Sequence, residues 1–121
     1  MKHSLEQLRC ANALVHSNKI GRGKEGGDRV KSFASMVQIN GLLASLAYAG
    51  KDEAANAEKD ICNAIIHHLR RVKEEGYAFF SMEITKPEDF ADYLKRCSVT
   101  EFRQINVEVI AFLNYLRRFA S

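Results

Sequence analysis

Apolar residues recur at three- and four-residue spacing along almost the whole chain, and this spacing limits the fold more than any other feature. Val30, Phe33, Ala34 and Val37 stand at i, i+3, i+4 and i+7, the pattern of one face of an α-helix. No segment alternates with period two for long enough to predict a strand; residues 77–84 are the only candidate, and we interpret them as a loop. The sequence therefore predicts an all-α fold.

Capping signals and glycines divide the chain into about five to six helices. Ser4 and Gln7 form a capping-box pair, so the first helix is expected over about residues 5–17. The glycines within residues 21–27 predict a flexible, basic loop. The other helices are expected from Asp28 to an interruption at Asn40-Gly41, over 42–49, over 52–75 with Gly76 as the stop, from a capping pair at Thr85 and Glu88 with Pro87 in the first turn to near Arg96, and from a cap at Ser98 and Glu101 to about Phe119.

The length and the apolar runs limit domain count and location. A chain of 121 residues has the usual size of one domain, so we expect a single helical domain over residues 1–121. The longest apolar run, residues 41–50, contains Ser45 and is too short to span a bilayer. The amino terminus has no apolar signal segment and meets Glu6 at once. We therefore expect a cytoplasmic protein without a membrane partner.

Cysteines and histidines do not predict a metal site. Cys10, Cys62 and Cys97 are odd in number, widely separated and never in Cys-x-x-Cys spacing, so they are expected to be small buried or half-buried hydrophobic residues. The neighbours His67 and His68 point about 100° apart on a helix, whereas a shared ion needs a spacing of three or four residues. We expect His67 to face solvent and His68 to lie at the edge of the apolar stripe.

No catalytic motif or cofactor motif is present either. The segment 21–24 has glycines and a lysine but lacks the spacing and the preceding strand of a phosphate-binding loop. Two interpretations of this segment stay open: Arg22 and Lys24 touch phosphates as point charges, or the segment is a solvated connector. No Gly-x-Ser-x-Gly elbow surrounds any serine. We therefore expect neither catalytic residues nor a cofactor, and a protein that binds rather than reacts.

Two helices predict how the chain presents its surface. On the first helix, Leu8, Ala11 and Val15 are expected to face the core, with Arg9 and His16 outward. The last helix has an inward stripe of Phe102, Ile105, Val109, Phe112, Leu113 and Leu116. Apolar residues also occur on its other side, which suggests a subunit interface unless a neighbouring helix of the same chain covers them: Val107, Ala111 and Tyr115.

The basic residues allow, but do not require, a polyanionic partner. The formal net charge is only +3. Charged helix faces are most often simply solvated. The candidate nucleic-acid-binding residues on predicted polar faces are Arg9, Lys31, Arg70, Arg71, Arg103, Arg117 and Arg118.

Three segments together carry a resemblance to a known family. They are Leu-Glu-Gln-Leu-Arg-Cys-Ala-Asn-Ala at 5–13, Gln-Ile-Asn-Gly-Leu-Leu-Ala-Ser-Leu-Ala-Tyr at 38–48, and Ala-Phe-Leu-Asn-Tyr-Leu-Arg-Arg-Phe-Ala at 111–120. In this order and spacing they resemble the small α-helical subunit of type III-B CRISPR effector complexes, the Cmr complexes. The chain departs from that pattern at Tyr115, where many members have tryptophan, and at Cys10, where they have alanine.

The resemblance implies a non-catalytic subunit. Several copies would stack beside the backbone subunits that hold the guide RNA, and would help to form a positively charged channel for the guide–target duplex in antiviral defence. The implied partners are other Cmr subunits, copies of the chain itself, guide RNA and target RNA. The alternatives are the small subunit of a type III-A complex and a stand-alone helical regulator that binds DNA or protein; a metal-dependent hydrolase is a distant third.

Overall fold

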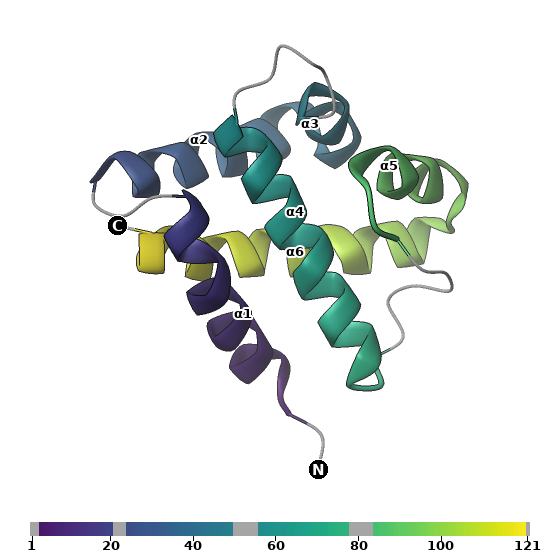
Figure 1. Ribbon diagram of the computed structural model, residues 1–121. Coiled ribbons are helices and arrows are strands. Elements are labelled where there is room, and N and C mark those ends of the chain that lie inside the picture. Colours follow the sequence, from purple (N-terminus) through teal and green to yellow (C-terminus); the bar gives the residue numbers. More distant parts are fainter. Residues whose placement is uncertain (1–2, 21–23, 50–55, 78–83, 121) are drawn as a thin grey trace.

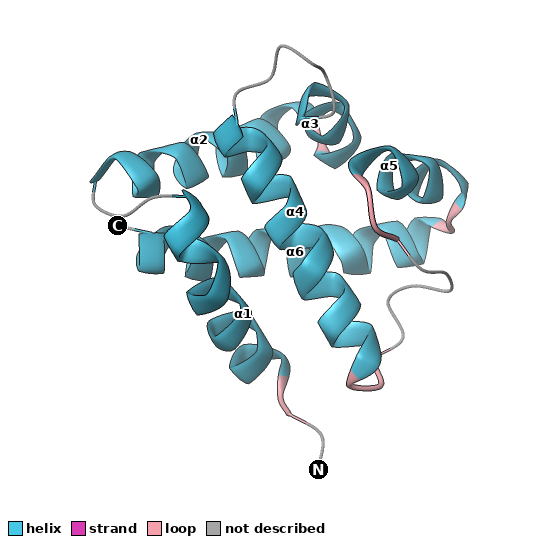
Figure 2. Ribbon diagram, in the orientation of Figure 1, coloured by secondary structure: helices cyan, strands magenta, loops and turns pink. Residues whose placement is uncertain are grey.

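The computed structural model of the chain describes residues 3–20, 24–49, 56–77 and 84–120, and within these residues every regular element is a helix (Figures 1 and 2). The predicted all-α class is therefore confirmed. In chain order the helices are α1 (Leu5–Ile20), α2 (Lys24–Asn40), α3 (Leu42–Ala49), α4 (Asn56–Glu74), α5 (Pro87–Arg96) and α6 (Val99–Ala120).

Side-chain caps start two of the helices where the sequence predicted them. At α1 the Ser4 backbone N–H donates to Gln7 Oε1 at 2.8 Å, and the Gln7 N–H donates to Ser4 Oγ at 3.1 Å, which completes the capping box. At α6 the Glu101 N–H donates to Ser98 Oγ at 3.1 Å. These bonds satisfy amide groups that a helix start leaves without a partner in the helix itself.

The predicted cap of α5 is wrong. The residue that precedes the helix is Lys86, and no side chain caps it, so Thr85 does not form the expected pair with Glu88. Pro87 does occupy the first turn, as predicted. Because proline has no N–H and its fixed φ suits a helix start, the helix begins there without a hydroxyl cap.

Two glycines end helices with a positive φ. Gly41, with φ of 92°, is the single residue between α2 and α3, and Gly76, with φ of 102°, follows α4. Other side chains are strained in this region of backbone space, so both predicted interruptions are confirmed.

Several predicted boundaries differ from the observed ones. The first helix runs to Ile20 rather than to about residue 17, and α2 already begins at Lys24, so most of the loop expected at 21–27 is helical. Gly27 is buried, and tertiary packing there outweighs the low helix propensity of glycine. Residues 21–23, the expected helix start at Asp52 and most of the loop expected at 77–84 lie outside the described residues.

Helix α6 runs through the middle of the fold, and α1, α2 and α4 pack against it (Figure 1). Its predicted inward stripe is buried except for Phe102, which is half-buried. Helices α3 and α5 pack against each other, and both also contact α4 (Figure 1). The largest fully buried side chains include Phe33, Phe90, Phe112, Leu42, Leu46, Ile61, Ile65, Leu69, Ile105, Leu113 and Leu116.

The predicted orientation of α1 is wrong. Leu8 is buried as expected, but Ala11 is exposed and Val15 is 62% exposed. Polar residues are buried in their place, among them Asn12 and Ser17. The wheel failed because it sorted residues by polarity, whereas here Asn12 finds a hydrogen-bond partner in His68 on α4 and Ser17 donates to the Leu14 carbonyl of its own helix.

Candidate nucleic-acid interface

Three of the predicted basic residues lie together on the outer face of α6. Arg103, Arg117 and Arg118 are exposed, and their positions on the helix fall within an arc of about 100°. The fifteen-residue separation of Arg103 and Arg118 corresponds to about 22 Å along the helix axis. The three guanidinium groups therefore span a length on the scale of several nucleotides of a nucleic-acid strand.

Negative charge is missing from the solvent-exposed part of this helix. Its two carboxylates are Glu101, which is half-buried, and Glu108, which is only 2% exposed. The described residues of α6 that are exposed are Val99, Thr100, Arg103, Gln104, Val107, Asn114, Arg117 and Arg118. With arginines and no carboxylate among them, this outer face of α6 has a positive potential that would attract phosphate groups.

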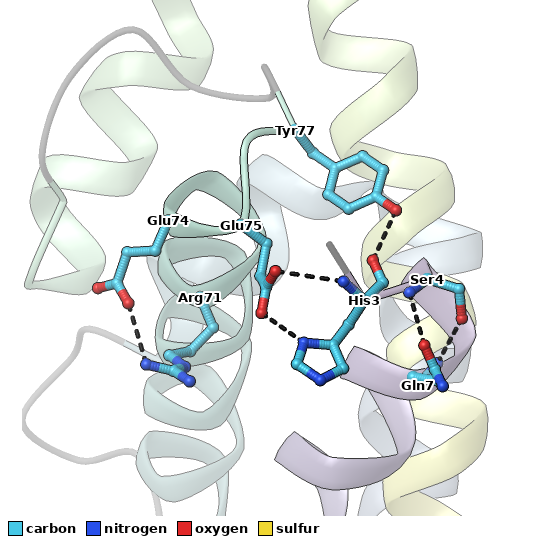
Figure 3. A network of polar contacts seen from close by, with 7 residues as sticks. All are labelled: His3, Ser4, Gln7, Arg71, Glu74, Glu75 and Tyr77. Atoms are coloured by element: carbon cyan, nitrogen blue, oxygen red, sulfur yellow. Dashed lines mark hydrogen bonds and ion pairs between the residues drawn. The ribbon is translucent and has the colours of Figure 1, made fainter. Parts of the chain in front are cut away.

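The candidates on α4 and α2 do not join this face, and Arg70 among them is half-buried. Arg70 and Arg71 are on α4, which crosses α6 on the side that α6 buries, as the stacking of His68 on Phe112 shows. Arg71 also donates to Glu74 at 3.0 Å (Figure 3), which offsets part of its charge. Lys31 is exposed on α2. These six residues of the predicted basic set therefore lie on three different helices rather than in one patch.

Arg9 is not on an outward face, contrary to the sequence prediction. Its Nε donates to Glu108 Oε2 at 2.7 Å and its Nη2 to Glu108 Oε1 at 2.6 Å, a bidentate pair between α1 and α6. This hydrogen bond raises the pKa of Arg9 further above its usual value. Burial by itself would raise the pKa of Glu108, but hydrogen bonds from Arg9 and then from His68 outweigh it and lower the pKa. The charge of Arg9 is thus neutralised within the fold.

His68 was predicted at the edge of the apolar stripe, but it is fully buried. Its Nε2 lies 2.9 Å from Glu108 Oε2, and its Nδ1 lies 2.8 Å from Asn12 Nδ2. Because the carboxylate only accepts, Nε2 carries the hydrogen and Nδ1 accepts from the Asn12 amide. The ring stacks on Phe112, with centroids 4.3 Å apart and planes 7° from parallel. His68 therefore links α1, α4 and α6.

His67 does not face solvent freely either. Its Nδ1 lies 2.8 Å from His16 Nε2, and the rings meet edge to face with centroids 4.6 Å apart. Burial, and then the neighbouring His67, lower the pKa of His16 to about 4. Burial, and then Arg71 and Arg70, lower the pKa of His67. Both imidazoles are therefore neutral near pH 7, and one donates to the other.

The amino-terminal segment is held against the end of α4 by a fourth set of contacts (Figure 3). His3 Nδ1 lies 2.7 Å from Glu75 Oε1, and the Tyr77 hydroxyl donates to the His3 carbonyl at 2.8 Å. The hydrogen bond from His3 lowers the pKa of Glu75. All four histidines of the chain thus make hydrogen bonds along the line where α1 and its leading residues meet α4, which we call the α1–α4 seam: His3, His16, His67 and His68.

Sequence reasoning missed the central residue of this network, Glu108. A signal was present: Ile105, Glu108, Val109 and Phe112 stand at i, i+3, i+4 and i+7, so the carboxylate falls within the inward stripe. A charge in such a stripe indicates a buried partner. The partner, Arg9, lies 99 residues away in sequence, and the spacing along one helix does not reveal it.

A comparison with protein families bears on the whole chain. The family model described as CRISPR-associated protein (Cas_Cmr5) matches residues 5–121. The chain belongs to this family. The resemblance seen in the sequence is thereby confirmed, and it indicates a small subunit of a Cmr-type CRISPR complex, which has other subunits as partners. Comparison with curated proteins and with solved structures gave no match.

In this Cas_Cmr5 chain, the predicted interface residues of α6 differ in their exposure. Val107 is 67% exposed, whereas Ala111 and Tyr115 are half-buried. Tyr115 forms one wall of a groove with Cys10, Ala11 and Leu14 of α1. The set Val107, Ala111 and Tyr115, which we call the α6 ridge, is therefore partly covered within the chain at Ala111 and Tyr115 and open to solvent at Val107.

The described residues of the chain contain no group of three or more His, Cys, Asp or Glu side chains placed to hold a metal ion. The cysteines are free, with Cys62 buried and Cys10 and Cys97 half-buried, as predicted. Burial raises the pKa of Cys62 to about 12, so its thiol is protonated and inert at neutral pH. None of the described helices combines the length and the apolar character that a membrane span requires.

Proposed function

We propose that this chain is a non-catalytic small subunit of a type III-B effector complex and that the outer face of α6 lines the channel for the guide–target duplex. The observation that supports this is the charge distribution of α6. Arg103, Arg117 and Arg118 are exposed, whereas Glu108 is buried and Glu101 is half-buried. The role places the chain in the cytoplasm, beside guide RNA and target RNA.

The other basic residues lie apart from the outer face of α6, and this limits how much RNA one copy can contact. Arg9 is engaged by Glu108, so it serves the fold. Arg70 and Arg71 on α4, and Lys31 on α2, lie on other surfaces, where they can meet a different stretch of RNA or an acidic neighbour. A single copy therefore offers a short strip of positive charge, and a continuous channel requires several copies stacked beside the backbone subunits.

The experiment measures binding of a fluorescent single-stranded RNA by anisotropy over a range of salt concentrations. The isolated chain is expected to bind weakly and without sequence preference. Replacing Arg103, Arg117 and Arg118 by glutamine should weaken binding and reduce the slope of log K against log salt by about 0.7 for each arginine that contacts a phosphate. Salt-independent, base-specific binding would instead indicate a regulator.

A matched control removes the same charge from another surface. Lys86, Lys95 and Arg96 are exposed on or beside α5, and their replacement by glutamine also removes three positive charges. If both triple variants lose affinity equally, net charge alone accounts for binding and the α6 channel proposal is wrong.

The absence of catalysis is tested separately. We expect the purified chain to leave RNA intact with Mg²⁺, Mn²⁺ or Zn²⁺ present, because cleavage in such complexes is expected to belong to other subunits. Metal-dependent cleavage that survives a second purification and co-elutes with the protein would contradict this part of the proposal.

A further inference from the structure

Helix α1 exposes apolar side chains on the side that points away from the core. Leu14 is 47% exposed and Val15 62% exposed, and Ala11 is exposed between them and the amino terminus. Two polar side chains of the same helix, Arg9 and Asn12, point inward and are engaged there. Helix α1 buries apolar residues too, Leu8, Ala13 and Ile20, but the exposed Ala11, Leu14 and Val15 form an apolar patch on its outer side that indicates a contact with another molecule.

A groove runs beside this face. Its walls are Gln7, Cys10, Ala11 and Leu14 of α1 and Tyr115 of α6, and Ser4 and Glu6 line it towards the amino terminus. Cys10 and Ala11 are small, so the groove is open where they line it. Leu14, the largest aliphatic side chain of this face, lies one turn from Ala11. Leu14, which could fill such a groove, thus lies on the same helix next to Cys10 and Ala11, where the groove is open.

The order of residues on this face suits an antiparallel copy of the same helix. Gln7, Ala11, Leu14 and Asn18 alternate four- and three-residue steps, the spacing of a helix–helix contact line. When two such helices lie antiparallel about a two-fold axis between residues 12 and 13, Ala11 faces Leu14 of the other copy and Gln7 faces its Asn18. Large meets small and polar meets polar at every layer.

The charges at the ends of the helix favour the same orientation. Glu6 stands at the amino-terminal end of the face and Lys19 at the carboxy-terminal end, and both are exposed. Antiparallel approach brings Glu6 of one copy to the end that carries Lys19 of the other, whereas parallel approach brings like charges together. The contact line itself carries no charge.

We propose that two copies of the chain bind each other through this face, with α1 against α1 in antiparallel orientation and Leu14 of each copy seated in the groove of the other. The contact is two-fold and closes at two copies, so it differs from end-to-end stacking. One helix pair buries less area than a stable dimer needs, so the dimer is weak and depends on concentration. The proposal concerns the free chain and does not rest on RNA binding.

Sedimentation velocity over a range of protein concentrations tests the dimer. The wild-type chain should shift from monomer towards dimer as its concentration rises. Leu14→Glu should remain monomeric at every concentration, because it places two charges in a contact that buries them. Ile39→Glu is the matched control: Ile39 is 81% exposed on α2, away from the groove, and this variant should dimerise like the wild type.

An exchange of the large and the small residue tests the register. Ala11→Leu alone fills the opening and should abolish dimerisation. The double variant Ala11→Leu/Leu14→Ala restores large against small across the two-fold axis and should dimerise again. Circular dichroism should show an unchanged helix content throughout, since Ala11 is exposed and Leu14 is half exposed.

Three outcomes would overturn the proposal: a wild-type chain that is monomeric at every concentration, a dimer that survives Leu14→Glu, or a double variant that fails to recover. If the wild-type chain is monomeric but another Cmr subunit binds the face and Leu14→Glu prevents this, the occupant is that subunit and the two-copy proposal is wrong. Loss of the dimer with intact RNA binding would leave the proposed function standing.

Discussion

Arginine occurs both inside this fold and on its surface, and the two sides of α6 show how differently its charge is used. On the inner side, Arg9 meets Glu108, and His68 completes the network beside Phe112. On the outer side, Arg103 and Arg118 face solvent without a carboxylate near them on α6. The inner charges of Arg9 and Glu108 neutralise each other, whereas the outer arginines can attract a polyanion.

The difference follows from the cost of burying charge. A buried ion loses its hydration, and only a close partner with additional hydrogen bonds compensates. Glu108 has such partners in Arg9 and His68, so removing one partner leaves an uncompensated group. An exposed arginine keeps its hydration, so its removal changes the external field far more than the free energy of folding. Substitutions on the two sides should therefore have opposite signatures.

The largest effect is expected from Glu108→Ala. It leaves Arg9 and His68 without their acceptor inside the fold, and we expect the free energy of unfolding to fall by about 3–5 kcal/mol. Urea denaturation followed by circular dichroism measures this. Glu101→Ala is the control on the same helix: Glu101 is half-buried in the first turn, and its loss should cost no more than about 1 kcal/mol.

A double variant separates the loss of a pair from the loss of an acceptor. Arg9→Met/Glu108→Leu replaces both charges by apolar groups of similar size, and it should be more stable than Glu108→Ala although it changes more residues. A loss below about 1 kcal/mol for Glu108→Ala would show that the network contributes little and that the comparison between the two sides is wrong.

Acid should weaken the inner side next. The pKa of His16 is lowered from 6.5 to about 4, so the unfolded chain binds a proton between these values that the folded chain does not. Stability is therefore complete above pH 6.5 and falls as the pH drops towards 4. The charged and titratable groups that face His16 and its hydrogen-bond partner His67 are Lys19, His68, Arg70, Arg71 and Glu74. Partial screening by solvent limits the loss to about 1–2 kcal/mol.

Thermal unfolding measured between pH 7 and pH 4.5 checks this expectation. In His16→Gln/His67→Gln, two amides can still hydrogen-bond but do not titrate, so the decline between pH 6.5 and 5 should become shallower than in the wild type. An identical decline in both proteins would assign the acid sensitivity to carboxylates, among them Glu108 and Glu75, whose pKa values are lowered in the fold.

The sequence predicted the helices better than it predicted the seam between them. The α6 stripe and the stops at Gly41 and Gly76 were predicted correctly, because periodic burial and positive φ depend on the residues of that helix or turn alone. The start of α2 was wrong, since tertiary packing there decided against local propensity.

The orientation of α1 and the places of His67 and His68 could not be predicted locally. Arg9 and Asn12 are inward only because Glu108 and His68 on other helices receive them. A single helix contains no information about such partners, so its polarity pattern predicted the reverse. The basic residues of α6 were predicted as candidates, but their separation from those of α4 depends on how the helices cross.

A smaller effect on stability, with a large effect on assembly, is expected from Ala111→Glu. Ala111 is half-buried at the edge of the outer face, between Val107 and Tyr115. If these residues contact a neighbouring subunit, the variant should fold with a loss of at most about 1 kcal/mol and fail to enter the complex, as pull-down with the other Cmr subunits would show. A large drop in melting temperature would instead place the ridge in the core.

The smallest effect on stability is expected on the outer side, where Arg103, Arg117 and Arg118 are replaced together by glutamine. Arg117 and Arg118 stand in the last turn of α6, where positive charge favours the helix dipole, so a few tenths of a kcal/mol each should be lost there. Arg103, near the start of the helix, should compensate in part when its charge is removed. The sum should stay below about 1 kcal/mol.

The α5 control variant has a similar layout, with Lys86 before the helix and Lys95 and Arg96 in its last turn. It also removes the ion pair of Lys95 with Asp92, but an exposed pair contributes little, so its change in stability should be close to that of the α6 variant. The two variants should then differ in RNA affinity alone. Because net charge, helix dipole and stability are matched between them, a difference in anisotropy reports where the phosphates lie. Equal affinity would remove the distinction between the two sides of α6, and a large loss of stability in the α6 variant would show that its arginines, like Arg9, serve the fold.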